Sequence, residues 1–147
     1  MILIKHDEQP WDEWRPGVVS RAWASAATGA QQVRIAEQVF DPGTQAPQHW
    51  HYFEENITVI AGTAEFTIDG ETATAGPGHT VVIHPLKRHG FRNVGEDKLH
   101  VIASMSWPIN EMMYDGANEG MAWRAGEVIN GGLRRQVDTV SAPTPVS

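Results

Sequence analysis

Two histidines and a glutamate lie close together in the sequence at spacings that suit a metal ion. His49, His51 and Glu55 follow the order H-x-H-x-x-x-E. Imidazole nitrogens and a carboxylate oxygen are ligands for zinc, iron, manganese, nickel or cobalt. Side chains two residues apart on a β-strand point to the same face, so we expect His49 and His51 to project together. Glu55 has the same parity and can return to that face after a short bend.

A further histidine, His89, is a candidate fourth ligand, and it precedes the run Gly90-Phe91-Arg92-Asn93. Three imidazoles and one carboxylate would give a metal a partial shell and leave positions open for water or substrate. The histidines at 79, 84 and 100 are expected to be structural or surface residues.

The spacing around the first histidines resembles the first motif of the cupin superfamily. Gly43 stands before His49 and His51, and Glu55 and Gly62 follow at the offsets of that motif. Because seven features fall at fixed offsets, the resemblance is specific.

The second cupin motif, G-(x)5-P-x-G-(x)2-H-(x)3-N, is matched with departures. Gly78, Pro85, His89 and Asn93 fill most of its places. Six residues separate Gly78 from Pro85 where the motif has five, Lys87 replaces the second glycine, and the histidine comes one residue early.

The resemblance covers about residues 30–107 and implies an all-β protein, a single cupin domain over residues 1–147. A jelly-roll β-barrel is expected over about 18–107, between an irregular N-terminal arm (1–17) and a C-terminal extension (108–147). The resemblance also implies one divalent transition metal, with iron, manganese, nickel and zinc left open. Its implied ligands are His49, His51, Glu55 and His89.

Short apolar segments between glycine and proline turns independently predict strands. They are expected at 17–28, 33–40, 49–51, 56–61, 64–69, 72–75, 80–84 and 99–107. Asp69-Gly70 predicts a tight hairpin. The expected core consists of Val33, Ile35, Ile57, Val59, Phe66, Ile68, Val81 and Ile83.

The amino-acid composition limits the classes of binding partner and of chemistry that this protein can have. A formal charge of −7 argues against nucleic acid and anionic membranes, which need clustered lysine and arginine. The absence of cysteine excludes disulfides and thiol catalysis. The apolar start before Lys5 is too short for a signal peptide, so a cytoplasmic protein is expected.

Trp11, Trp14 and Trp23 suggest a homodimer interface. The alternative is that the arm folds back on its own barrel.

These features predict a metal-dependent enzyme acting on a small organic substrate. A dioxygenase is the first choice. A lyase, isomerase or decarboxylase without redox chemistry, acting on a small acid or sugar derivative, is the second. Glu55 is the candidate catalytic residue, because a carboxylate that leaves the metal can act as a base. A small-ligand-binding protein without catalysis is the remaining alternative, since this fold hosts several functions.

Overall fold

The computed structural model describes residues 1–113, 123–125 and 136–137. Within these ranges the regular structure consists of strands and two short 3-10 helices, η1 (His6–Glu8) and η2 (Ala26–Thr28). The all-β fold expected from the sequence is therefore confirmed.

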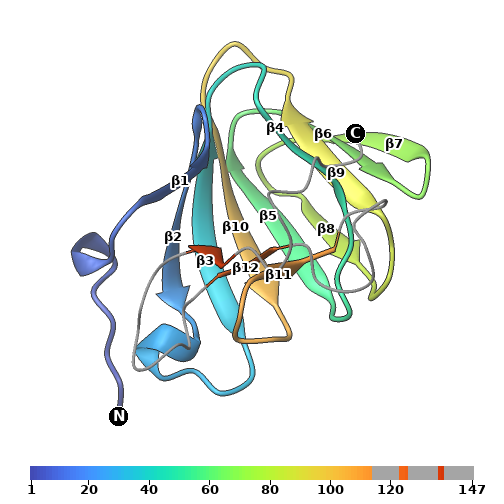
Figure 1. Cartoon of the computed structure of the whole chain (residues 1–147). Coiled ribbons are helices and arrows are strands. Elements are labelled where there is room, and N and C mark those ends of the chain that lie inside the picture. The colour runs from blue at the N-terminus through green and yellow to red at the C-terminus, as the bar shows by residue number, and fades with distance from the viewer. Residues whose placement is uncertain (114–122, 126–135, 138–147) are drawn as a thin grey trace.

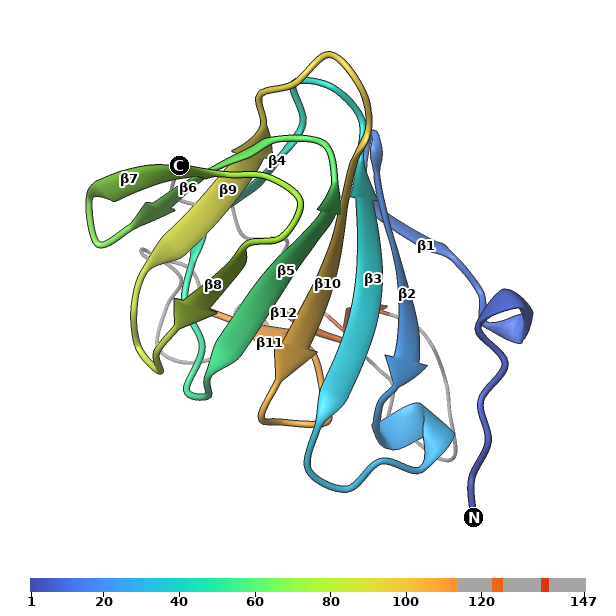
Figure 2. The same cartoon turned by 180° about the vertical axis from the view of Figure 1, so that it is seen from behind.

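Two antiparallel sheets form the barrel (Figures 1 and 2). The larger sheet has the order β1 (Asp12–Arg15), β2 (Val18–Ala24), β3 (Arg34–Phe40), β10 (Leu99–Met105), β5 (Glu55–Ala61), β8 (Thr80–Ile83). The smaller has the order β4 (Gln45–His49), β9 (His89–Asn93), β6 (Ala64–Ile68), β7 (Glu71–Ala75). A third, minor sheet joins β11 (Glu111–Met112), β12 (Trp123–Ala125) and β13 (Gln136–Val137).

One hydrophobic core lies between the two large sheets. Alternate residues of β10 point into it, and Val101 and Ala103 are fully buried. The opposite sheet contributes Phe66 and Phe91, whose rings stack with centroids 4.9 Å apart. Alternation of this kind is what a strand with one covered face produces, so both sheets hold their inward side chains at fixed positions.

The core differs from the expected one at β3 and the residue before it. Val33 is 44% exposed and Ile35 is only half-buried, whereas Ala36 and Phe40 are fully buried. The inward parity of β3 is therefore even-numbered, because Phe40 is directed inward and side chains alternate along the strand. The expected positions on β5, β6 and β8 (Ile57, Val59, Phe66 and Ile83) are confirmed, while Ile68 and Val81 are partly buried against the core.

The N-terminal arm is not wholly irregular. Residues 12–15 form β1, which pairs with β2 and becomes an edge of the larger sheet. Strand β9, which begins at His89, was also not predicted. Both segments contain few β-branched residues, so their strand conformation comes from pairing with distant strands rather than from local preference.

Tryptophans of the N-terminal region contact their own barrel. Trp14 packs against the core, the Trp23 indole N–H donates to Glu37 at 3.1 Å, and Trp11 lies over the Arg21 guanidinium at 4.3 Å. These contacts favour the alternative in which the arm folds back. The homodimer stays a prediction, and the mass in solution from light scattering checks it.

The hairpin expected at Asp69-Gly70 joins β6 to β7. The two residues have φ angles of 47° and 84°. Two positive φ angles in succession define the type I′ turn, which matches the twist of the flanking strands. The sequence signal and the structure agree here residue by residue.

Two motif glycines with positive φ are expected to respond differently to alanine. The φ angles are 79° at Gly43 and 86° at Gly62, so either change forces a left-handed L-residue, which costs about 1 kcal/mol. A Cβ at Gly62 would also lie 2.7 Å from the Lys98 carbonyl oxygen, whereas at Gly43 it meets nothing within 4 Å. We therefore expect Gly62→Ala to lower the free energy of unfolding by about 3 kcal/mol. Urea titration of both variants checks this, and equal losses would contradict it.

Candidate metal centre

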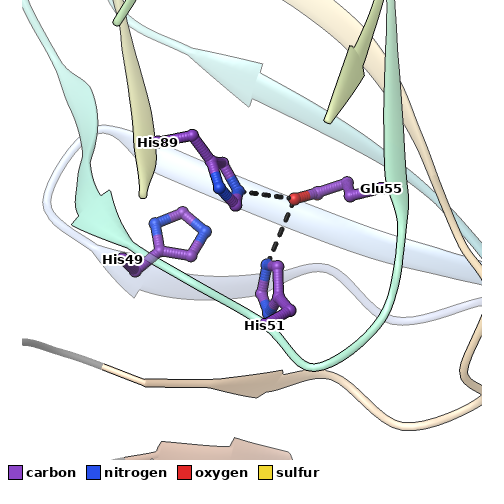
Figure 3. A group of neighbouring side chains, drawn as sticks. All are labelled: His49, His51, Glu55 and His89. Carbon is purple, nitrogen blue, oxygen red and sulfur yellow. Dashed lines mark hydrogen bonds and ion pairs between the residues drawn. The ribbon is translucent and has the colours of Figure 1, made fainter. Parts of the chain in front are cut away.

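The four candidate ligands come from three strands and the turn that follows one of them. His49 ends β4, His51 lies just beyond it, Glu55 begins β5 and His89 begins β9. His49 and His89 are register partners across the β4–β9 pair. All four side chains are buried, and their ligand atoms lie within 4.8 Å of one another (Figure 3). The structure thus brings together all four residues that the sequence singled out.

Main-chain carbonyls fix the orientation of two imidazole rings. His49 Nδ1 lies 2.7 Å from the Pro47 oxygen, and His89 Nδ1 lies 2.8 Å from the Lys87 oxygen. A carbonyl oxygen only accepts hydrogen bonds, so each Nδ1 carries the proton and donates it. In the neutral ring, Nε2 then presents a lone pair to the site.

The third ring is fixed from further along the chain. His51 Nδ1 donates to the carbonyl oxygen of Glu111, the first residue of β11. All three histidines therefore have the same tautomer, with Nε2 as the atom available to a metal. Such outer hydrogen bonds orient metal-binding histidines and raise their basicity.

The carboxylate completes a donor set that needs a cation. Glu55 Oε2 lies 3.1 Å from His51 Nε2 and 3.0 Å from His89 Nε2. Lone pairs that face a carboxylate oxygen repel it unless a proton or a cation lies between them. Three imidazole nitrogens and one carboxylate oxygen suit a divalent transition metal. The side chains present therefore fit the ion that the sequence implied.

The surroundings shift two pKa values in the cluster. Burial acts to raise the pKa of Glu55, but the interactions of its carboxylate with His51 and His89 outweigh burial, and the pKa lies well below the usual range. Burial, followed by the nearby His89 and His51, lowers the pKa of His49 well below its ordinary value. The cluster thus favours an ionised carboxylate beside a neutral imidazole, which is the form that binds a metal.

The metal-free protein is expected to lose stability in mild acid. As pH falls below the ordinary histidine pKa of 6.5, the unfolded chain gains a proton at His49 that the folded chain resists. The free energy of unfolding should therefore fall by up to about 1.4 kcal/mol per pH unit. Glu55, with its depressed pKa, adds a second loss only below its ordinary value of 4.5.

Chemical unfolding with chelator at several pH values measures this dependence. His49→Gln should flatten the slope just below pH 6.5, while His84→Gln, at an exposed position, should keep it. An unchanged slope in His49→Gln would contradict the assignment.

A small cavity of about 20 Å³ adjoins the cluster. A cavity of that size accommodates about one water molecule or one small chemical group. Its lining residues are Trp14, Gln38, Ala46, His49, His51, Glu55, Phe91, Met105, Asn110 and Met112. The sequence suggested Trp14 only for a dimer interface, and it did not single out Gln38, Asn110 or Met112 as site residues. Only the parity of Gln38 with Phe40 on β3 could have indicated one of them.

The aromatic residues near the ligands and the remaining histidines of the barrel lie in different places. Phe91 lines the cavity, and Phe53 stacks on the His51 ring with centroids 4.7 Å apart. Tyr52 is exposed. His100 pairs with Glu37 at 2.8 Å, on the side of β10 opposite to its buried residues. His79 and His84 are exposed, so these three histidines lie outside the centre as expected.

Two antiparallel sheets with a buried three-histidine, one-carboxylate cluster define a jelly-roll barrel with a candidate metal centre. Residues 36–105 match the model of the cupin domain. These residues therefore form a cupin domain, as the motif spacing predicted.

Three similar proteins illustrate the likeness. The polyketide synthase CurC of Streptomyces cyaneus is 29% identical over 93 residues, which span 63% of this chain and 60% of CurC. Protein SchB of Streptomyces halstedii is 28% identical over 101 residues, 68% of this chain and 73% of SchB. The structure of the polyketide cyclase RemF from Streptomyces resistomycificus gives a TM-score of 0.68 at 19% identity, covering 81% of this chain and 88% of RemF.

Among the described residues, no helix is long and apolar enough to cross a membrane. The cytoplasmic location stays a prediction.

Proposed function

We propose that the protein is a metal-dependent enzyme acting on a small, oxygen-rich organic molecule. The observation that carries the proposal is the convergence of three Nε2 lone pairs and one carboxylate oxygen, with every Nδ1 held by a carbonyl. A divalent ion bound there would polarise a carbonyl group or bind dioxygen. A structural metal site is usually closed by four protein ligands in a tetrahedron. The candidate metal site of this protein adjoins a cavity, which favours a catalytic or ligand-binding role over a purely structural one.

The protein's own residues supply binding, orientation and proton transfer. The imidazoles hold their Nε2 atoms at fixed positions, since each ring is tied to the main chain. Glu55, kept ionised by its neighbours, is placed to accept a proton from a bound substrate. Phe91, Met105 and Met112 line the cavity with apolar surface. Such walls exclude bulk water and strengthen the electrostatic interactions inside.

Within this class we propose non-redox carbonyl chemistry on a polyketide-like substrate, one that carries several ketone groups. The likeness to CurC supports it, since that relative is named as a polyketide synthase. Removing a proton from the carbon atom between two carbonyl groups needs a base and a group that polarises a carbonyl. Glu55 would be the base, and the metal would polarise the carbonyl. The dioxygenase predicted first from the sequence is the second candidate, and the donor set supports it equally.

Oxygen uptake separates the two reactions. The protein is loaded with Fe²⁺, Mn²⁺, Ni²⁺ or Zn²⁺ and incubated with diketones, phenols and small hydroxy acids in an oxygen electrode, with products followed by mass spectrometry. Products of unchanged mass, or lighter by water or carbon dioxide, without oxygen uptake support the carbonyl chemistry. Stoichiometric oxygen uptake supports the dioxygenase. Tight metal binding with no turnover of any compound would contradict the enzyme proposal and favour a ligand-binding protein.

A further inference from the structure

The segment 108–113, here called the strap, closes one side of the metal cavity. One end is held by the Ala26 N–H, which donates to the Pro108 oxygen at 3.0 Å. The other end is held by two reciprocal main-chain bonds of 2.9 Å between Trp50 and Met113. Since Trp50 stands between His49 and His51 in the sequence, the strap is fastened directly to the ligand-bearing segment.

The strap places one polar side chain in the cavity that has an unused acceptor. Asn110 is 7% exposed and lines the same cavity as His49, His51 and Glu55. Its Oδ1 has no hydrogen-bond partner among the residues that the structure describes. An unsatisfied buried acceptor destabilises the folded state, and such groups are rare in native proteins. A bound molecule that donates a hydrogen bond would satisfy it.

We propose that Asn110 is the specificity-determining contact of this site, and that its Oδ1 accepts a hydrogen bond from a hydroxyl or enol group of the substrate. The inference rests on the proposed function, because it places that group beside the metal. The cavity of about 20 Å³ admits one group of the size of a water molecule. The substrate therefore enters with a single hydroxyl-sized donor, and a methyl group in the same place is rejected because it leaves the acceptor unpaired.

The chain offers a matched control for this contact. Asn56 also has a buried Oδ1 without a hydrogen-bond partner in the described part of the chain, while its Nδ2 donates to Glu54 at 3.2 Å. It lies on β5 but does not line the cavity. Asn56→Leu therefore removes the same kind of oxygen without touching the proposed contact.

The first measurement is the melting temperature of the metal-free variants. Replacing an unsatisfied amide by an apolar side chain of similar size should raise the melting temperature for Asn110→Leu, by about 2–6 °C. A clear fall would show that Asn110 is a structural residue with satisfied bonds and would overturn the proposal. Asn110→Ala, which adds no bulk, serves as the second variant for binding should the leucine fit poorly.

The second measurement is the affinity of Zn²⁺-loaded protein for glycolate and for propionate, by calorimetry. The two carboxylates differ in a hydroxyl against a methyl group at the same position. The parent protein should prefer glycolate by about ten-fold. Asn110→Leu and Asn110→Ala should lose most of that preference, and Asn56→Leu should retain it.

The outcomes separate the two proposals. A parent protein that binds no zinc overturns the metal site and with it this contact. Zinc binding with an unchanged glycolate preference in both Asn110 variants overturns the contact alone. A loss of the same size in Asn56→Leu also overturns it, because the effect would then not belong to the cavity.

Discussion

His51→Ala is expected to lose the metal and keep the fold. The variant removes one Nε2 ligand and, with it, the hydrogen bond to Glu111. Mutating only the partners of metal ligands typically weakens binding 10- to 100-fold, so loss of a ligand itself should weaken it by more than about 100-fold. The barrel has its own core between the sheets, so the melting temperature of the metal-free variant should stay close to that of the parent.

Elemental analysis and metal titration measure the loss, and circular dichroism with thermal melting measures the fold. His84→Ala is the control, because that histidine is exposed and outside the cluster. It should bind metal as the parent does. An unfolded His51→Ala protein would mean that the metal is structural and would weaken the enzyme proposal, whereas full metal retention would remove His51 from the ligand set.

Phe40→Ala is expected to have the opposite effect, a large loss of stability with the ligands left in place. Phe40 is fully buried, and its ring contacts Trp14 edge-on at 6.5 Å and Phe91 at 4.9 Å between centroids. Truncation of a buried phenylalanine leaves a cavity and lowers the free energy of unfolding by about 3–5 kcal/mol. Because Trp14 and Phe91 line the metal cavity, their support is lost as well.

Urea unfolding gives the size of this loss. Val33→Ala is the control, since Val33 is 44% exposed and truncation of a surface residue usually changes stability by less than about 0.5 kcal/mol. Should the two variants lose similar amounts, the assignment of Phe40 to the centre of the core would be wrong. Metal titration of the folded Phe40→Ala protein should still detect the site.

The candidate ligands were predictable because three of them are close in sequence and their spacing carries the geometry. His49, His51 and Glu55 need only the alternation of a strand and a short bend. His89 departs from its motif by one residue, yet it lies opposite His49 in the β4–β9 register. Strand pairing therefore places this ring beside the others in spite of the irregular spacing.

Other features depend on contacts that no local pattern reveals. Strand β1 forms because it pairs with β2, and β9 forms between β4 and β6. The β-branched residues Val33 and Ile35 suggested the wrong inward face for β3, because Phe40 and its parity decide which face is covered. The contribution of Asn110 and of the Glu111 carbonyl depends on where the strap returns to the barrel, which composition alone does not indicate.

The hydrogen bond between the His51 ring and the strap has a thermodynamic consequence. If docking of the strap makes the free energy of metal binding more favourable, a bound metal makes docking of the strap more favourable by the same amount. This holds because coupling between two sites is reciprocal. Metal loading and closure of this side of the barrel are therefore one linked equilibrium. Met113→Pro, which removes the main-chain N–H that donates to the Trp50 oxygen at one end of the strap, would therefore lower metal affinity without touching a ligand.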